Sequence, residues 1–233
     1  MNKYAIILGG GKGVRMGGSI PKQFLILSGK PLLMYTLEAF FRADPEIDLI
    51  LVLPESQQDF WKDLCKQYRF EIKHRIVNGG KTRYESVKNG LALLSEQGLV
   101  AVHDGVRPFI GVDLIERCYT AAAQFGAVVP VTELTESIRR LEDETSFSER
   151  RETFRLVQTP QTFRLDVLKQ AYQYPYNDSF TDDASVVDAA GFKIELVNGC
   201  RENIKITTPL DLSLAEQIIK MNPDLKQNVR FSK

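Results

Sequence analysis

The stretch that decides the fold is YAIILGGGKGVRMGGSIPKQF, residues 4–24. It begins with an apolar run at 4–8 and continues with glycines over 9–18, the pattern of a buried strand followed by a tight backbone turn. Glycines in this position let the backbone turn sharply and point its N–H groups at a phosphate. Arg15 and Lys22 add positive charge beside the turn. We therefore expect an anion-binding loop directly after the first strand.

Two common phosphate-binding motifs do not fit this stretch or its surroundings. The dinucleotide fingerprint G-x-G-x-x-G fails because its last position is Val14 or Met16, depending on the starting glycine. The loop G-x-x-x-x-G-K-[ST] fails at 80–82 because Arg75 stands where its first glycine is required. A looser glycine loop with a guanidinium and an ammonium suits a triphosphate, because arginine binds phosphate oxygens in pairs and lysine acts as a point charge.

Outside this stretch, short apolar runs alternate with longer segments of helical period. Strands are expected at 4–8, 47–53, 72–77, 99–103, 127–131 and 193–197, and helices at 31–42, 57–68, 83–95, 113–125, 165–172, 182–190 and 209–220. This alternation predicts a single domain, residues 1–233, with an α/β, three-layer, Rossmann-like fold and a mainly parallel sheet. Ligands of such sheets bind beyond the carboxyl ends of the strands. Residues 9–15, 79–83 and 103–108 each follow a strand, so we expect them to be neighbours.

The alternation fails between residues 132 and 161, where the chain is charged and poor in apolar residues. Residues 135–140 and 151–157 alternate well enough to form a hairpin. Ordered loops of this length are uncommon unless they are functional. We therefore expect a β-arm at 132–158 that projects from the sheet, with a disordered loop as the alternative.

Charge and composition exclude several classes of protein. Lys and Arg number 30 and Asp and Glu number 30, so no bulk positive field exists to attract nucleic acid or an anionic membrane. No apolar run approaches the roughly 20 residues of a membrane helix. Cys65, Cys118 and Cys200 lie far apart, which argues against a disulfide framework, and His74 and His103 are too few for a multi-histidine metal site. We expect a cytoplasmic protein without nucleic-acid or membrane partners.

Six short motifs follow one another in order along nearly the whole chain. They are G-G-x-G-x-R-M with P-K-Q-F within 9–24, N-G-G with Arg83 and Ser86 within 78–87, H-D with R-P-F within 103–109, Q-T-P-Q at 158–161, T-D-D-A at 181–184, and N-I-K-I-T with Pro209 and Asp211 within 203–212. Together they resemble the sugar-phosphate nucleotidyltransferases, and within them the cytidylyltransferases of polyol phosphates. The resemblance implies a nucleotidyltransferase fold and a reaction in which CTP and a polyol phosphate give a CDP-polyol and pyrophosphate, with Mg²⁺ as cofactor. The motifs are most similar to those of enzymes that use 2-C-methyl-D-erythritol 4-phosphate in non-mevalonate isoprenoid synthesis, and ribitol 5-phosphate is the alternative acceptor.

The resemblance also implies roles for individual residues. Arg15, Lys22 and Lys205 are expected to stabilise the α-phosphate as it becomes five-coordinate, because cations there gain strength as negative charge grows. Lys205 is expected on a strand that ends near Thr207. The residues expected to bind CTP are Gly9, Gly10, Gly11, Gly13, Gly79, Gly80, Ser86 and Gly105.

Asp104 is the expected metal ligand. It follows a strand that ends at His103, so its carboxylate should lie at the carboxyl edge of the sheet. Mg²⁺ usually takes one or two carboxylates together with phosphate oxygens. The alternative for Asp104 is a helix cap for the segment that begins near Gly111. We expect His103 to be structural, and Arg83 to anchor its loop rather than to touch ligand.

The acceptor phosphate needs its own cationic pocket, which the resemblance assigns to the arm. Arg151 and Thr181 are expected to bind the acceptor across the interface of a homodimer formed through the β-arm, with Ser137 contacting the polyol. The neighbouring Arg150 is the alternative to Arg151. Glu136-Ser137 stands where the family usually has Asp-Thr, and 132–135 resembles an insertion, so the register of the arm stays open.

Overall fold

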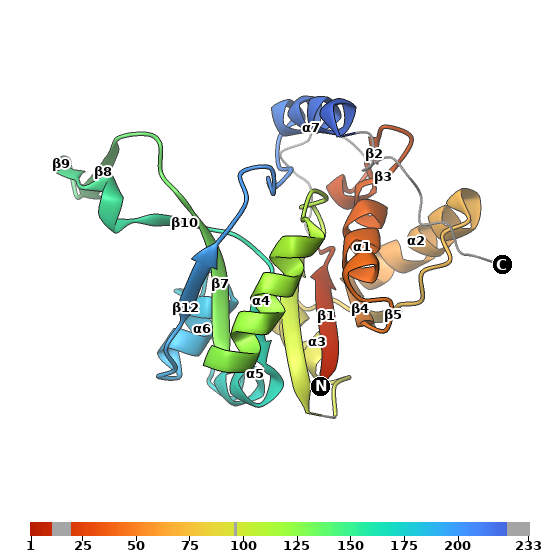
Figure 1. Ribbon diagram of the computed structural model, residues 1–233, viewed down its shortest axis with the longest axis horizontal. Helices are drawn as coiled ribbons and strands as arrows, with labels where there is room; N and C mark the ends of the chain where they lie inside the picture. The colour runs from red at the N-terminus through yellow and green to blue at the C-terminus, as the bar shows by residue number, and fades with distance from the viewer. Residues whose placement is uncertain (11–19, 96, 223–233) are drawn as a thin grey trace.

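The computed structural model describes residues 1–10, 20–95 and 97–222, and over these ranges one eight-stranded sheet runs through the protein (Figure 1). Its strands are β1 (Asn2–Leu8), β4 (Asp48–Leu53), β5 (Arg75–Asn78), β6 (Gly98–Asp104), β7 (Ala127–Glu133), β10 (Arg155–Val157), β11 (Gln161–Arg164) and β12 (Glu195–Asn198). Their order is β10-β7-β11-β6-β1-β4-β5, and β12 pairs with β7. The prediction of a mainly parallel sheet is confirmed, because β5, β4, β1 and β6 are parallel neighbours.

The second half of the sheet contains two antiparallel strands that were not predicted as part of the sheet. β11 lies between β6 and β7 and is antiparallel to both. β10 is antiparallel to the end of β7. Both strands are short and carry polar residues among apolar ones, so their hydrophobic pattern is weak. Their pairing is decided by backbone groups that neighbouring strands leave open.

Helices cover both faces of the sheet, which confirms the three-layer prediction. One face is covered by α1 (Leu32–Ala43), α2 (Glu55–Tyr68) and α4 (Val112–Phe125), and the other by α3 (Arg83–Leu91), α5 (Leu165–Ala171) and α6 (Asp183–Ala189). Side chains of a strand alternate between faces. In β1, Ala5 and Ile7 pack into the first core, whereas Tyr4 and Ile6 pack into the second. Both cores are made of buried apolar residues, and this burial is the main favourable contribution to folding.

A third, smaller cluster closes the carboxyl edge of the sheet. α7 (Pro209–Met221) lies across this edge in Figure 1, near the short strands β2 (Ile26–Leu27) and β3 (Lys30–Pro31). Ala215 and Ile219 of α7 are buried against Leu27 and Ile206. The helix begins at a capping box, in which the Thr208 hydroxyl accepts a hydrogen bond from the Asp211 N–H, and the Asp211 carboxylate accepts one from the Thr208 N–H. This start fixes the direction in which the preceding residues, 203–207, reach the edge.

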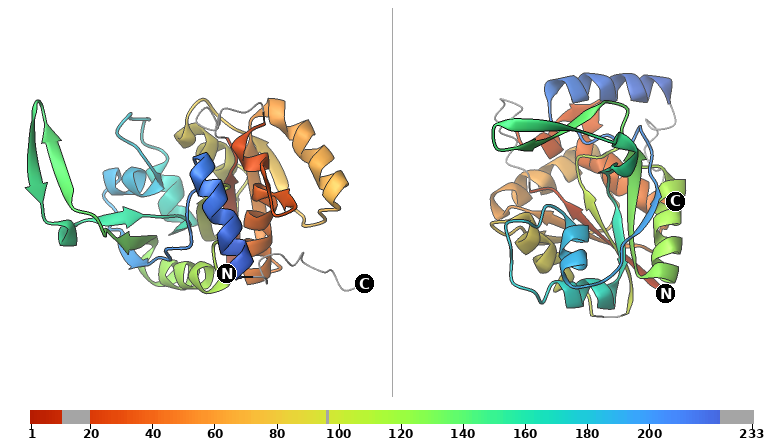
Figure 2. Two further views of the ribbon diagram at one scale, coloured as in Figure 1. Left: turned by 90° about the horizontal axis from the view of Figure 1, so that it is seen from above. Right: turned by 90° about the vertical axis from the view of Figure 1, so that its left-hand side faces the viewer.

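A hairpin projects from the body of the protein, as expected for the β-arm at 132–158 (Figures 1 and 2). Its strands are β8 (Ile138–Glu142) and β9 (Thr145–Glu149), joined by a turn with Asp143 at positive φ. The prediction that 151–157 forms the second arm strand is wrong. Arg155–Val157 pairs with the free edge of β7, and the tight turn at Asp143 brings β9 back onto β8 instead.

No helix in residues 1–10, 20–95 and 97–222 is long and apolar enough to cross a membrane.

Candidate active site

A cavity of about 370 Å³ opens at the carboxyl edge of β1, β4 and β6. The end of β1 lies beside the end of β6, because Leu8 and Asp104 are partners in the sheet register. The three segments that the sequence predicts to be neighbours meet here through residues 9–10, residues 80–83, and Asp104 with Val106. The volume is within the range of small-molecule sites. Predicted site residues that line the cavity are Gly9, Gly10, Lys22, Gly80, Ser86, Asp104 and Lys205.

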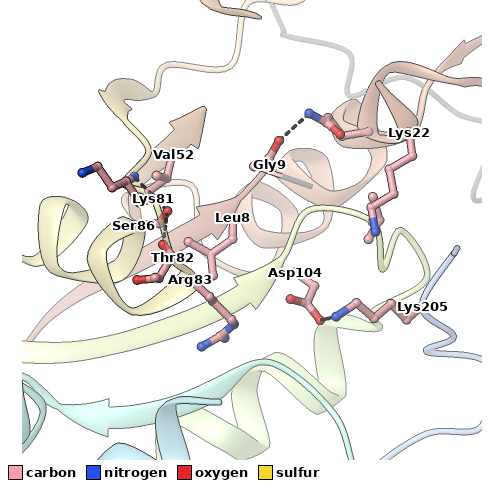
Figure 3. A pocket seen from close by; sticks show the side chains of 14 residues that line it. Leu8, Gly9, Lys22, Val52, Lys81, Thr82, Arg83, Ser86, Asp104 and Lys205 are labelled. Atoms are coloured by element: carbon pink, nitrogen blue, oxygen red, sulfur yellow. Dashed lines mark hydrogen bonds and ion pairs between the residues drawn. The ribbon is translucent and has the colours of Figure 1, made fainter. Parts of the chain in front are cut away.

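The charged centre of the cavity is an ion pair between Asp104 and Lys205 (Figure 3). Lys205 Nζ lies 2.9 Å from Asp104 Oδ2, and Arg107 Nε lies 3.4 Å from the same oxygen. Burial alone raises the pKa of the Asp104 carboxyl, but Lys205, Arg83 and Arg107 outweigh burial and hold this pKa well below its usual range. Asp104 is therefore an anion throughout the physiological pH range.

Lys205 reaches the cavity from an extended segment, not from the strand that the sequence predicts. Residues 203–207 lie outside any strand. The Ile206 N–H donates to the Val106 carbonyl at 2.9 Å, and the Asn203 amide donates to the Thr159 carbonyl at 2.8 Å. The segment crosses the edge of the sheet and forms its hydrogen bonds with loops there, so it does not pair with a strand. These contacts aim Lys205 at Asp104.

Lys22 approaches from the opposite wall on the short helix η2 (Lys22–Phe24). The next residue, Gln23, is fully buried, and its amide nitrogen donates to the Gly9 carbonyl and to Gln57. Phe24 stacks on Trp61 with ring centroids 6.0 Å apart. In Figure 3 the Lys22 side chain extends toward Asp104 and Lys205. Two lysines from distant parts of the chain thus converge on one space.

The turn at 79–82 is braced from within. The Ser86 hydroxyl accepts the Gly80 N–H at 3.0 Å and donates to the Thr82 carbonyl at 2.9 Å. The Gly79 N–H donates to the Leu53 carbonyl at 2.9 Å, which holds the turn to the end of β4. A side chain on Gly80 would lie 2.2 Å from Glu85 Cβ, so only glycine fits. Gly80 and Ser86 line the cavity, whereas Gly79 lies just outside its lining.

The other glycines assigned to CTP have different surroundings. The Gly9 N–H donates to the Val52 carbonyl and the Gly105 N–H to the Leu8 carbonyl, both at 2.9 Å. Gly105 lies outside the cavity lining, whereas Gly10 lines the cavity and has open space where a Cβ would stand. Three assigned residues, Gly11, Gly13 and Arg15, lie outside the described residues.

The residues assigned to the acceptor do not line this cavity. Arg151 lies at the base of the arm in a second pocket of about 210 Å³, where it donates to the Thr135 carbonyl at 2.6 Å. Ser137 is exposed nearby, on the arm. Thr181 is exposed directly before α6. Within one chain, the described residues thus bring Gly9, Gly10, Gly80 and Ser86 of the expected CTP site into one cavity, but not the residues expected around the acceptor.

Two groups that the sequence did not assign to the site contribute to it. Arg83 lines the cavity in addition to anchoring its loop, and Arg107 joins Asp104 to the Asn203 carbonyl. Both lie inside motifs, but only the fold reveals that Arg107 contacts Asp104 and that the charge of Arg83 acts on it. The buried His103 is structural, as expected, because its ring bonds to Thr159 and to the Arg107 carbonyl.

Asp104 fits a magnesium ion that arrives with a nucleotide. In the described part of the chain, no group of three His, Cys, Asp or Glu residues could hold a metal by protein ligands alone. Mg²⁺ commonly uses a single carboxylate together with phosphate oxygens and water. One oxygen of Asp104 faces Lys205, and the other points toward the space between Asp104 and Arg83 (Figure 3).

This site defines a class of protein. At the carboxyl edge of the sheet, where ligands of such folds bind, Lys22 and Lys205 approach an ionised carboxylate, and cations placed in this way can stabilise the charge that grows on a phosphate under attack. That is the chemistry of a nucleotidyltransferase. A sequence model of the 2-C-methyl-D-erythritol 4-phosphate cytidylyltransferase family matches residues 4–221, and the chain belongs to that family.

Relatives and solved structures agree with this assignment. The chain is 55% identical to 2-C-methyl-D-erythritol 4-phosphate cytidylyltransferase of Phocaeicola vulgatus. The match extends over 219 residues, which are 94% of this chain and 100% of the relative. It is 52% identical to the protein of the same name from Bacteroides thetaiotaomicron, with the same coverage. The crystal structure of 4-diphosphocytidyl-2C-methyl-D-erythritol synthase from Anaerococcus prevotii superposes with a TM-score of 0.80 at 29% identity, over 94% of this chain and 98% of that chain. The 2-C-methyl-D-erythritol 4-phosphate cytidylyltransferase of Thermus thermophilus superposes with a TM-score of 0.77 at 33% identity, over 94% and 100%.

Proposed function

We propose that this chain transfers the cytidylyl group of CTP to 2-C-methyl-D-erythritol 4-phosphate, giving 4-diphosphocytidyl-2-C-methyl-D-erythritol and pyrophosphate. The observation that carries the proposal is the meeting of Lys22, Lys205 and Asp104 in one cavity of a chain that belongs to this family. The curated relatives at 55% and 52% identity carry the name of this activity. Ribitol 5-phosphate is therefore not the favoured acceptor.

The reaction requires charge stabilisation more than proton transfer. The acceptor's phosphate is largely ionised near neutral pH, so one of its oxygens can attack the α-phosphorus without a base. A new P–O bond forms while the bond to the bridging oxygen breaks, and pyrophosphate leaves with that electron pair. Negative charge grows on the oxygens of the five-coordinate phosphorus, where Lys22 and Lys205 gain strength. Arg15 has the same role by resemblance.

The ion pair with Asp104 keeps Lys205 in place before the substrates bind. Its ammonium pairs with Asp104 and remains partly exposed toward the cavity. The three protons of an ammonium can be shared between Asp104 and a phosphate oxygen. Lys205 can thus contact the α-phosphate without a large change of position, which lowers the cost of reorganisation in the transition state.

Asp104 is the residue that would hold Mg²⁺. Bound with oxygens of the triphosphate, the ion would neutralise charge on the leaving pyrophosphate. Asp104 is suited to this task because it stays ionised and is pointed into the cavity by the end of β6.

The nucleotide would be held largely by backbone groups. Gly9, Gly10, Gly11 and Gly13 surround the phosphates in this proposal, and Gly79, Gly80 and Ser86 contact the cytosine. The Ser86 hydroxyl already accepts from Gly80 and donates to Thr82, so one acceptor position is left for the base. Gly105 supports the site through the hydrogen bond from its N–H to the Leu8 carbonyl, which joins the end of β6 to the end of β1.

The acceptor site is completed by a second copy of the chain through the β-arm. Arg151 and Thr181 would bind the acceptor phosphate across the dimer interface, with Ser137 on the polyol. The arm and its base expose large apolar side chains that a partner would cover, namely Leu141, Phe147, Phe154 and Leu156. Apolar groups gathered on a projecting hairpin are typical of an interface.

A substrate panel tests the proposed function. Purified protein is mixed with Mg²⁺, one nucleotide (CTP, UTP or ATP) and one acceptor (2-C-methyl-D-erythritol 4-phosphate, ribitol 5-phosphate or glycerol 3-phosphate), and pyrophosphate release is recorded. We expect rapid release only with CTP and the methylerythritol phosphate. Faster release with ribitol 5-phosphate, or none with any pair, would contradict the proposal.

A further inference from the structure

Arg83 joins the turn of the nucleotide cavity to the start of a helix on the acceptor side. It is the first residue of α3, directly after the turn at 79–82, and its side chain lines the cavity. Its Nη2 atom donates to Asp183 Oδ2 at 2.5 Å, between residues that are 100 positions apart. Asp183 is the first residue of α6. One ion pair therefore links two segments that carry different parts of the site.

The carboxylate of Asp183 is held from two sides and is fully buried. The Tyr172 hydroxyl donates to Oδ1 at 2.7 Å, while Arg83 occupies Oδ2. Burial opposes the charge on Arg83, but Asp183 outweighs it and raises the pKa of the guanidinium above its usual value. Desolvation offsets much of the attraction in such a pair, although breaking one partner is costly. The pair thus fixes the position of the start of α6 relative to the start of α3 more than it raises the free energy of unfolding.

The start of α6 is also tied to the central sheet. Gln161 of β11 is fully buried, and its amide nitrogen donates to Asp182 Oδ2 at 2.7 Å. Its amide oxygen accepts the Ala184 N–H at 2.8 Å. Thr181 directly precedes Asp182, so its position follows from these bonds and from the Arg83 ion pair.

From these contacts we infer that Arg83 and Asp183 are positioning residues that couple the two substrate sites. The 79–82 turn, α3 and the start of α6 form one continuous set of hydrogen bonds, so the position that the turn takes around a bound nucleotide also sets that of Thr181. CTP then increases the affinity for the acceptor phosphate, and the acceptor increases the affinity for CTP by the same factor. The inference rests on the proposed function, in which Thr181 contacts the acceptor.

The test measures binding rather than turnover. An α,β-methylene analogue of CTP cannot release pyrophosphate, and its Kd is measured by titration calorimetry with and without saturating 2-C-methyl-D-erythritol 4-phosphate. In the unaltered protein we expect the acceptor to lower this Kd about fivefold or more. The coupling ratio is the Kd without the acceptor divided by the Kd with it. In Asp183→Asn we expect this ratio to approach one, while the Kd for the analogue alone changes less than about twofold.

Asp48→Asn is the matched control. Asp48 forms an ion pair with Arg75 between β4 and β5, at the opposite edge of the sheet, and this variant should keep the full ratio. Should Asp183→Asn fail to fold, Tyr172→Phe keeps the charge pair and removes one bond to Asp183, and a ratio reduced by about half supports the inference.

Two results would overturn the inference: a ratio of one in the unaltered protein, or an unchanged ratio in both Asp183→Asn and Tyr172→Phe. Thr181→Ala separates the inference from the proposed function. If this variant weakens acceptor binding while Asp183→Asn keeps the full ratio, only the coupling is wrong. If Thr181→Ala leaves acceptor binding unchanged, the assigned acceptor site is wrong, and the inference falls with it.

Discussion

The ammonium of Lys205 lies 2.9 Å from the carboxylate of Asp104, and this ion pair joins the C-terminal part of the chain to the end of a central strand. Both groups line the cavity into which Lys22 also extends. The pair keeps Asp104 ionised and Lys205 oriented before any substrate binds. A site with its charges already in place needs little reorganisation when charge develops on a phosphate.

Replacing Lys205 with alanine should remove a cation from the transition state. We expect kcat to fall by at least about 10²-fold, while the Kd for CTP changes far less, because the lysine gains most strength when the phosphorus becomes five-coordinate. Steady-state kinetics and CTP titration check this. Lys193→Ala is the control, because Lys193 is highly exposed on the surface and pairs with Glu195. An unchanged kcat in Lys205→Ala would remove its catalytic role.

Replacing Lys22 with alanine should have a similar effect for the same reason. We expect a loss of at least about 10²-fold in kcat, without a change in thermal stability, because Gln23 and Phe24 hold η2 in place independently of Lys22. Calorimetry and pyrophosphate release measure the two quantities. Lys62→Ala on the exposed face of α2 should change neither. Full activity in Lys22→Ala would contradict the assignment.

The buried His103 should make the protein less stable in acid. Burial lowers the pKa of His103 from its ordinary 6.5 to about 4. Between these pH values the unfolded chain binds a proton that the folded chain does not, so the free energy of unfolding falls as the pH drops from 6.5 toward 4. We expect a slope of up to about 1 kcal/mol per pH unit from this residue, measured by urea unfolding.

His103→Asn should remove this part of the slope. Burial also lowers the pKa of His74, so the part of the slope from His74 remains in the variant. His74→Asn is the matched control, because it leaves His103 in place. Equal slopes in the unaltered protein and in His103→Asn would show that His103 is not buried in its neutral form.

Two glycines of the cavity should respond differently to alanine. A Cβ on Gly80 would lie 2.2 Å from Glu85 Cβ, so Gly80→Ala must displace the turn and should lower both CTP affinity and thermal stability. A Cβ on Gly10 meets nothing within 4 Å, so Gly10→Ala should keep its stability and lose CTP affinity, because its methyl group enters the space of the nucleotide. Melting curves and CTP titration test this. Unchanged CTP affinity in Gly10→Ala would mean that the nucleotide lies elsewhere.

Two impaired variants should restore activity when they are mixed and assayed at low acceptor concentration, if subunits share sites. Arg151→Ala should mainly raise the KM for the acceptor, and Lys205→Ala should mainly lower kcat. In a random mixture, half of the dimers are mixed, and each has one site with neither change, so about a quarter of the full activity should return. Arg150→Ala, mixed in the same way, tests the register of the arm. No recovery with either arginine variant would exclude an acceptor site shared through the arm.

The sequence by itself determined the layers of the fold and the succession of its main strands and helices along the chain. Hydrophobic periodicity is a local property, and the runs at 4–8, 47–53 and 99–103 are long enough to specify buried strands. Because the carboxyl ends of parallel strands meet at one edge, the neighbourhood of Gly9, Gly80 and Asp104 could also be predicted. The motifs that follow these strands therefore predicted most of the residues that line the cavity.

Only the tertiary structure decided the pairings and contacts between distant segments. β11 and β10 fill open edges of β6 and β7, and β9 rather than 151–157 completes the arm. Lys205 lies on an extended crossing and not on a strand, and Arg83 binds Asp183 across the protein. The physical reason is that a hydrophobic pattern specifies which side chains are buried, whereas pairing depends on which backbone groups remain unsatisfied once the core has formed.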